Sequence, residues 1–317
     1  MNKTGYFTHG DCRLHEMGVG HPECPQRLDA IEDRLLVSGV GDALERREAA
    51  PASLADVELA HGRRYIASLR GLTEALREDI VAGGPTHAQI DPDTSMNVST
   101  WDAALRATGA AIAATDAVMA GELENAFCAI RPPGHHACRD RAMGFCFFNS
   151  VAVAAKYALE RHGLQRVAIV DFDVHHGNGT EDIVAGDARI LMVSFYQHPF
   201  YPYGGARSDA PNLVNLPVPA FTRGAAIRDL VESVWIARLE AHRPQMIFIS
   251  AGFDAHRDDE LGQLGLVEQD YAWITARIKD VARRHADKRI VSCLEGGYNL
   301  NALGRSVESH LRVLADV

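Results

Sequence analysis

Residues 167–177, with the sequence VAIVDFDVHHG, decide the fold prediction, because an apolar run of strand length passes directly into polar side chains. Short apolar runs of this kind are typical of parallel strands that are covered on both faces. Further apolar runs of strand length lie at residues 127–130, 190–193, 246–249 and 290–294. The pattern therefore predicts a buried parallel sheet with chemistry at the ends of its strands.

Helical patterns alternate with these strand-like runs. Between Pro25 and Gly39, apolar residues recur at helical spacing, and further helices are expected at 100–119, 149–161, 223–242, 269–285 and 301–314. This alternation predicts an α/β fold with a mainly parallel sheet and helices on both faces. No linker rich in Pro, Gly or Ser interrupts it, so residues 1–317 are expected to form a single domain. Long functional loops are expected at 10–23, 83–99 and 197–219.

Composition excludes several classes of protein. The 317 residues are 47% hydrophobic, which is ordinary for a globular chain and too high for a disordered one. The longest apolar runs fall far short of the roughly 18 residues of a membrane span. The net charge of 32 − 42 = −10 disfavours binding to nucleic acid. Six cysteines without a C-x-x-C pair, and a start without an apolar leader, predict reduced thiols and a cytoplasmic location.

The polar residues after two of the strand-like runs predict a metal site. Residues two apart in an extended chain point to one side, so Asp171, Asp173 and His175 share a side at a strand end. Asp254 follows the run 246–249 and supplies a further carboxylate. An isolated Asp in this position is more often a helix N-cap, and only the pairing with the first motif favours a ligand. Two Asp and one His leave an open position on zinc, and Fe(II) or Co(II) would also fit.

Two further motifs predict acid–base and oxyanion chemistry. RPPGHH at 131–136 ends in the adjacent His135 and His136, which can supply a general base and a second proton donor. EGGY at 295–298 contains two glycines that allow Tyr298 to turn inwards, towards a developing oxyanion. Alone, a Tyr after Gly-Gly is more often a packing residue. Together the motifs predict metal-assisted hydrolysis of a carbonyl compound.

In this order, the motifs resemble the zinc-dependent histone deacetylase family, within the arginase/deacetylase superfamily. The resemblance runs from GHPE at 20–23 to EGGY at 295–298 and is closest to class II-like bacterial deacetylases and amidohydrolases. It implies the arginase/deacetylase fold, with a central, mainly parallel eight-stranded sheet flanked by helices on both faces. It also implies a zinc-dependent amidohydrolase that removes acetyl or other acyl groups from the ε-amine of lysine, through metal-activated water.

The same resemblance implies roles for individual residues. His136 would be the general base paired with Asn178, and His135 an electrostatic helper paired with Asp171. Tyr298 would bind the scissile carbonyl. The implied zinc ligands are Asp173, His175 and Asp254, and the implied structural potassium site comprises Asp171, Asp173, His175, Ser194 and Phe195.

Substrate selection is the most open part of the resemblance. Gly144 and Phe145 would line an acyl-lysine tunnel, and Tyr201 stands where the opposite wall normally has Phe. Leu261 aligns with a gatekeeper position and favours peptide-lysine deacylation, whereas a one-residue slip would place Glu260 there and favour acetylated polyamines. In relatives, an acid in the loop that here contains Asp91 and Asp93 holds the substrate backbone.

Three alternatives to a lysine deacylase stay open. The first is an acetylpolyamine amidohydrolase, with the same chemistry and a different leaving group. The second is a binuclear ureohydrolase, which needs further bridging carboxylates. The third is a non-catalytic acyl-lysine binder, which would be expected to lack Tyr298 or a zinc ligand. A homo-oligomer is compatible with each of them.

Overall fold

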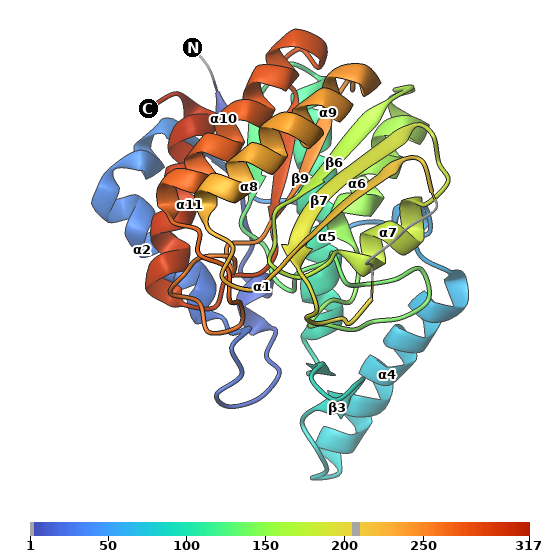
Figure 1. Cartoon of the computed structure of the whole chain (residues 1–317). Helices are drawn as coiled ribbons and strands as arrows, with labels where there is room; N and C mark the ends of the chain where they lie inside the picture. Colours follow the sequence, from blue (N-terminus) through green and yellow to red (C-terminus); the bar gives the residue numbers. More distant parts are fainter. Residues whose placement is uncertain (1–2, 205–209) are drawn as a thin grey trace.

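A computed structural model describes residues 3–204 and 210–317 and contains an eight-stranded sheet (Figure 1). Its strands lie in the order β2-β1-β5-β10-β9-β6-β7-β8, and every pairing between them in the described residues is parallel. The predicted α/β fold with a central eight-stranded sheet is thus confirmed. The strands are β1 (Thr4–Phe7), β2 (Leu44–Arg47), β5 (Asn125–Cys128), β6 (Val167–Asp171), β7 (Ile190–Gln197), β8 (Leu213–Val218), β9 (Ile247–Ala251) and β10 (Ile290–Leu294).

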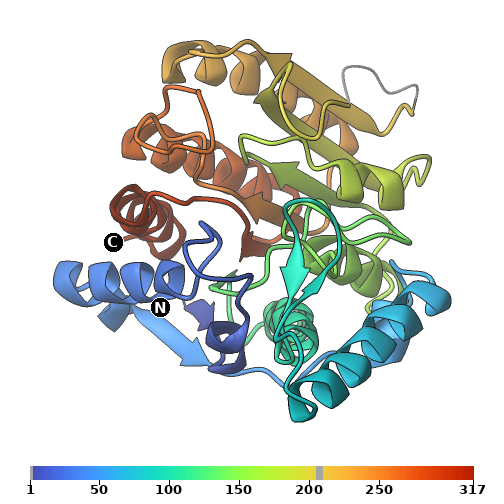
Figure 2. The same ribbon diagram turned by 90° about the horizontal axis from the view of Figure 1, so that it is seen from below.

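Helices form a layer on each face of the sheet, as the view from below shows (Figure 2). One layer contains α5 (Thr100–Met119), α6 (Ser150–Arg161) and α7 (Asn178–Val184). The other contains α2 (Gln26–Ser38), α8 (Gly224–Leu230), α9 (Ala237–His242), α10 (Glu268–His285) and α11 (Leu300–Ala315). A π-helical segment, Val231–Ile236, joins α8 to α9, so the helix expected at 223–242 has three parts. None of the described helices combines the length and apolar character of a membrane span.

The three segments expected to be loops contain short regular elements, which corrects that expectation. β8 lies within 197–219, α1 (Asp11–Leu14) within 10–23, and an antiparallel pair, β3 (Ala88–Gln89) and β4 (Ser95–Met96), within 83–99. α3 (Leu54–Val57) precedes α4 (Arg63–Val81) in the chain, and α4 projects beyond the body of the molecule together with β3 (Figure 1).

The order of the strands places the predicted motifs together. β5, β10, β9 and β6 are neighbours in the middle of the sheet, and every residue in them is buried. Because these strands are parallel, their carboxyl ends share one edge. The motifs that follow them, at 131–136, 295–298, 254 and 171–177, therefore meet at that edge.

Candidate active site

Two carboxylates and one imidazole converge at this edge of the sheet. Asp173, His175 and Asp254 each offer one ligand atom, and these atoms lie within 4.8 Å of one another. His175 Nδ1 is 3.1 Å from Asp173 Oδ1 and 3.2 Å from Asp254 Oδ2. In the described residues no second group of this kind is found.

Main-chain N–H groups fix both carboxylates. The N–H of His175 donates to Asp173 Oδ1 at 2.8 Å, and the N–H of Gly296 donates to Asp173 Oδ2 at 2.9 Å. The N–H of Val174 donates to Asp254 Oδ1 at 2.8 Å, which leaves Asp254 Oδ2 facing His175. A methyl group on Gly296 would overlap the Asp254 carboxylate, so this close approach requires glycine.

The electrostatics of the three residues fit a cation. Burial and the nearby Asp173 charge raise the pKa of Asp254 to about 7. Burial lowers the pKa of His175, but hydrogen bonds to Asp173 and Asp254 outweigh it and raise the value to about 10. Both shifts follow from two negative groups confined together out of water, an arrangement that a divalent cation stabilises. The donor set, one imidazole nitrogen and two carboxylate oxygens, suits zinc, Fe(II) or Co(II).

The two adjacent histidines have opposite electrostatic environments. His135 Nδ1 is 3.0 Å from Asp171 Oδ2, and its Nε2 is 3.7 Å from Asp173 Oδ2. Burial opposes its protonation, but the two carboxylates raise the pKa of His135 well above its ordinary value. Burial, together with the positive neighbours His135 and His175, holds the pKa of His136 well below its ordinary value. The pKa values of the two adjacent histidines are therefore shifted in opposite directions.

The side chain of Asn178 determines which nitrogen of His136 is free. Asn178 Oδ1 lies 2.7 Å from His136 Nδ1 and can only accept, so Nδ1 carries the proton. Nε2 of His136 is then left as an acceptor, and His136 lines the cavity described below. Asn178 begins α7, directly after the segment that holds Asp173 and His175.

A buried carboxylate ties the histidine pair to the loop after β10. Glu295 Oε2 accepts from the N–H groups of Gly134 and His135 at 2.6 and 3.0 Å, and Ser250 donates to its other oxygen at 3.0 Å. Glu295 is not among the functional residues expected from the sequence, where it stands only as part of EGGY at 295–298. Its position directly after a buried strand was the signal that could have found it.

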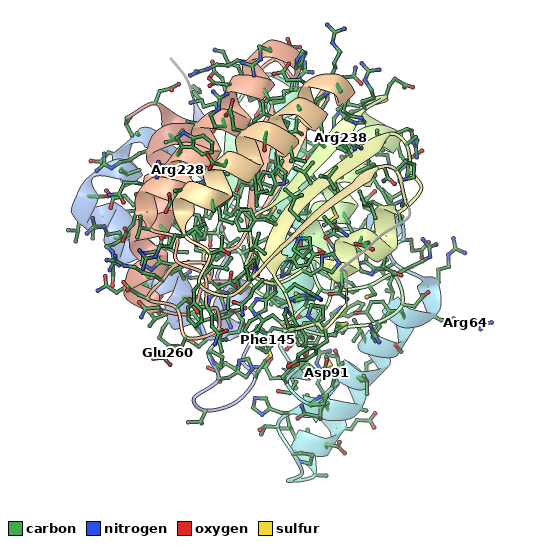
Figure 3. All side chains as sticks on the ribbon, in the orientation of Figure 1. Arg64, Asp91, Phe145, Arg228, Arg238 and Glu260 are labelled. Atoms are coloured by element: carbon green, nitrogen blue, oxygen red, sulfur yellow. The ribbon has the colours of Figure 1, made fainter. Side chains whose placement is uncertain are left out.

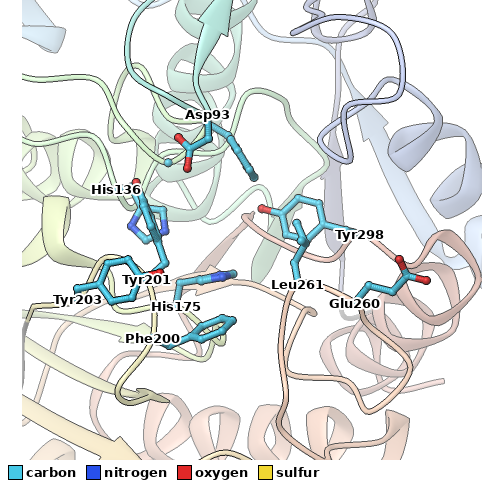
Figure 4. A pocket seen from close by; sticks show the side chains of 11 residues that line it. Asp93, His136, His175, Phe200, Tyr201, Tyr203, Glu260, Leu261 and Tyr298 are labelled. Atoms are coloured by element: carbon cyan, nitrogen blue, oxygen red, sulfur yellow. The ribbon is translucent and has the colours of Figure 1, made fainter.

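Tyr298 is held by its main chain and by a cation. Asp259 Oδ2 accepts from the N–H of Tyr298 at 2.6 Å, and the Arg27 guanidinium lies 5.0 Å from the centre of the Tyr298 ring. Burial is the main cause that raises the pKa of Tyr298 well above its ordinary value, so the phenol remains protonated. Its hydroxyl points across the cavity towards His136 (Figure 4).

These groups open into a cavity of about 230 Å³ with aromatic walls. Phe145 and Tyr298 meet edge to face, with ring centroids 5.8 Å apart. On the other side, the Tyr201 ring contacts His136 edge to face at 5.2 Å, and Phe200 stacks on His175 at 5.4 Å. Phe200 is not among the residues expected from the sequence, and only its place beside Tyr201 could have indicated it.

Gly144 and Phe145 form a tight corner of this cavity. Their φ angles are +56° and +68°, and a methyl group on Gly144 would overlap the His136 ring. The N–H of Phe145 donates to Thr94 Oγ1 at 3.0 Å, which braces this corner against the loop before β4. Glycine at 144 therefore lets the Phe145 wall lie directly against the histidine pair.

The outer part of the cavity is formed by loops. Asp93, Tyr203, Glu260 and Leu261 complete its lining. The Leu261 side chain lies beside Tyr298, whereas the Glu260 carboxylate points away (Figure 4). Burial and the nearby Asp91 raise the pKa of Asp93 to about 6. Phe145, Asp91 and Glu260 lie at the same end of the molecule, far from Arg228 and Arg238 (Figure 3).

Three of the five residues named for the potassium site, Asp171, Ser194 and Phe195, lie on the neighbouring strands β6 and β7, and the other two, Asp173 and His175, follow β6 directly. Asp171 of β6 and Ser194 of β7 are partners in the parallel ladder, and Phe195 follows Ser194. The Phe195 ring stacks on Trp235, with ring centroids 5.3 Å apart. Phe195 could therefore contribute to an ion site only through its main chain. This placement brings the main chains of Asp171 and Ser194 together.

Comparisons with known proteins agree with this geometry. A histone deacetylase domain matches residues 21–314. The histone deacetylase-like amidohydrolase of Pseudomonas aeruginosa is 39% identical over 288 residues, which cover 89% of this chain and 73% of that protein. This chain belongs to the histone deacetylase family. The probable deacetylase of Archaeoglobus fulgidus is a further relative, 36% identical over 305 residues, which cover 94% of this chain and 82% of that protein.

A solved structure supports the same assignment to the histone deacetylase family. The crystal structure of the HDA15 HD domain matches with a TM-score of 0.88 and 30% sequence identity, covering 99% of this chain and 88% of that one. The predicted resemblance to the histone deacetylase family is confirmed. Family membership supports a deacetylase or amidohydrolase activity on acylated substrates.

Proposed function

We propose that this protein is a zinc-dependent deacylase that hydrolyses acyl groups on the ε-amine of lysine, with residues 1–317 forming one catalytic domain. One observation carries the proposal. The Asp173, His175 and Asp254 group lies at the base of an aromatic cavity that also exposes His136 and Tyr298. A non-catalytic binder has no need of this complete set.

The metal would be held by Asp173 Oδ1, His175 Nδ1 and Asp254 Oδ2, the three atoms that face one another. When bound, zinc would polarise the acyl carbonyl and acidify the attacking water. Asn178 keeps a proton on His136 Nδ1, so Nε2 is the atom that accepts the proton of the water. The low pKa of His136 keeps this nitrogen unprotonated before the reaction.

Tyr298 and His135 would act on the charge that develops during the reaction. The protonated phenol of Tyr298 donates to the oxyanion from a fixed position, which costs no reorganisation at the transition state. His135, charged beside Asp171, adds a positive field close to the same point. His136 then returns its proton to the leaving amine.

The shape of the cavity favours a lysine side chain. Phe145, Phe200 and Tyr201 provide apolar walls for the methylene groups between the amide and the main chain. Leu261 rather than Glu260 points to the cavity beside Tyr298, so no carboxylate at this position selects a second amine (Figure 4). Asp93, at the outer end, is suited to accept from the N–H groups of a peptide main chain.

We also propose a structural potassium ion held by Asp171, Asp173, His175, Ser194 and Phe195, mostly through main-chain oxygens. The pairing of Asp171 with Ser194 in the parallel ladder supports this proposal, because it brings the main chains of these two proposed ligands together. Removing potassium from the buffer should then lower thermal stability, and replacing it with lithium should not restore it.

The proposal is tested by comparing two substrates on one preparation. We expect kcat/KM for an acetyl-lysine peptide to exceed that for N-acetylputrescine, and we expect Tyr298→Phe to lower kcat for the peptide by about 10² to 10³ while metal content stays unchanged. A preference for N-acetylputrescine would favour the acetylpolyamine alternative. Metal binding without hydrolysis of acetyl or longer acyl substrates would favour the binder.

A further inference from the structure

The amide of Asn178 has sulfur atoms on the side that faces away from His136. Asn178 Nδ2 lies 3.4 Å from Met143 Sδ and 3.5 Å from Cys138 Sγ, both from the segment that follows the histidine pair. Asn178 Oδ1 meets His136 Nδ1 at 2.7 Å. The amide is therefore clamped between a ring nitrogen and a pair of sulfur atoms.

The chemistry of the two sulfurs permits one orientation of the amide. A thioether has lone pairs and no proton, so Met143 can accept from the NH₂ group and cannot donate to the carbonyl oxygen. The Cys138 thiol lies 3.7 Å from the carbonyl oxygen of His136 and can donate its proton there. Burial and the nearby Asp182 raise the pKa of Cys138, so the thiol keeps that proton.

The orientation of the amide sets the tautomer of His136. If the amide were reversed, its NH₂ group would face Nδ1, which would then have to be an acceptor. The proton would move to Nε2, and His136 would have no free nitrogen for the attacking water. A carboxylate in this position would not need orienting, because both of its oxygens accept.

We propose that Met143 and Cys138 are positioning residues that orient the Asn178 amide and thereby keep Nε2 of His136 free as the base. The proposal rests on the proposed function only for its kinetic consequences, since the tautomer is a property of the protein itself. The two sulfur atoms are thus needed to orient residue 178 because it is a neutral Asn. An Asp at this position would need no such orientation.

The test uses Met143→Leu with Cys138→Ala in the zinc-loaded protein. Met143→Leu conserves volume and removes only the acceptor, and Met246→Leu, in the buried core, is the matched control. We expect the double variant to lower kcat for an acetyl-lysine peptide about tenfold with KM unchanged, because two weak hydrogen bonds are lost. Met246→Leu should change kcat less than twofold.

The same two substitutions are then made in an Asn178→Asp background. Because an Asp needs no orienting, the loss of kcat caused by removing the sulfurs should shrink to less than twofold relative to Asn178→Asp alone. An equal loss in both backgrounds would overturn the proposal, since it would show that the sulfurs act only through packing around the histidine pair.

A measurement that needs no substrate separates this proposal from the proposed function. Long-range ¹H–¹⁵N correlation spectra of protein labelled on histidine distinguish the two tautomers of His136, whose signals are assigned by their loss in His136→Ala. We expect the Nδ1–H tautomer in the wild type and a substantial Nε2–H population in the double variant. An unchanged tautomer would overturn the proposal, whether or not the enzyme hydrolyses acyl-lysine.

Discussion

The floor and the rim of the cavity are built differently. The floor consists of residues that directly follow the central strands, and it comprises His135, His136, Asp173, His175, Asp254 and Tyr298. The rim consists of residues on longer loops, and it comprises Asp93, Phe200, Tyr203, Glu260 and Leu261. Asp173 and Asp254 are fully buried, whereas Tyr203 is 80% exposed.

Because floor and rim are built differently, the residues suited to the reaction are separate from the residues suited to selecting the substrate. On the floor, main-chain N–H groups fix the carboxylates, and the sheet fixes the main chain. A buried charge without such partners would be costly, so little can change there without loss of the site. Rim side chains border on solvent and can change at small cost. The floor should therefore determine the reaction, and the rim the substrate.

The largest effect is expected from removing a carboxylate of the floor. Asp173→Ala removes a proposed metal ligand and the acceptor for Gly296 N–H, so bound zinc should fall below one tenth of the wild-type content and kcat/KM by about 10³ or more. Metal analysis and peptide hydrolysis measure both. Asp33→Ala, an exposed position on α2, is the control. Full zinc content in Asp173→Ala would refute the assigned ligand set.

A second large effect, on stability, should come from the buried ion pairs beneath the floor. Glu23 is fully buried and forms a bidentate ion pair with Arg131, at 2.5 and 2.6 Å, and a further pair with Arg27 at 3.0 Å. Arg27 in turn donates to the carbonyl oxygens of Glu295 and Gly297. Glu23→Gln would leave buried guanidinium charges unpaired and should lower the free energy of unfolding by about 3–5 kcal/mol.

The pH dependence of this effect has a definite sign. Burial raises the pKa of Glu23, but Arg131 and His15 outweigh it and hold the pKa well below its ordinary value. Glu23 thus contributes fully to stability above its pKa in the unfolded chain, about 4.3. This contribution is lost as the pH falls towards the lowered pKa of Glu23 in the folded protein. The free energy of unfolding, measured with urea, should differ between wild type and Glu23→Gln by a constant amount above about pH 5. Below about pH 4 this difference should become smaller. An equal loss in the exposed control Glu48→Gln would contradict this explanation.

The floor could be predicted from sequence because each of its motifs directly follows a buried strand. Five apolar runs marked β5, β6, β7, β9 and β10, and parallel geometry then required the motifs to meet at one edge. Edge strands lack this signal. β2 reads Leu-Glu-Arg-Arg with only Leu44 buried, and β8 contains Pro217, so neither shows an apolar run.

The rim could be predicted only in part, because loop conformation depends on distant partners. Thr94 braces Phe145 from a segment about fifty residues earlier in the chain, and no local pattern shows this contact. Phe200 was not predicted for a similar reason, because its role comes from its contact with His175, which only the folded chain supplies.

A smaller effect is expected at the rim, on selectivity. Leu261→Glu would place a carboxylate beside the cavity and should raise the ratio of kcat/KM for N-acetylputrescine to that for the peptide roughly tenfold, through attraction of the second amine. Glu260→Gln is the matched control, since that carboxylate points away from the cavity (Figure 4). A larger shift in Glu260→Gln than in Leu261→Glu would show that Glu260 is the gatekeeper.

The smallest effect should come from the hydroxyl of Tyr201. Its ring lines the cavity, but its oxygen is buried without a hydrogen-bond partner among the described residues. Tyr201→Phe keeps the apolar wall and removes an unsatisfied polar atom, so stability should rise by about 1 kcal/mol. If the wall acts only through its apolar surface, kcat/KM should stay within twofold for acetyl, propionyl and butyryl peptides. A several-fold rise in KM would instead show that the hydroxyl forms a hydrogen bond with the substrate. Tyr201 would then recognise the acyl-lysine amide and not only pack in the cavity wall.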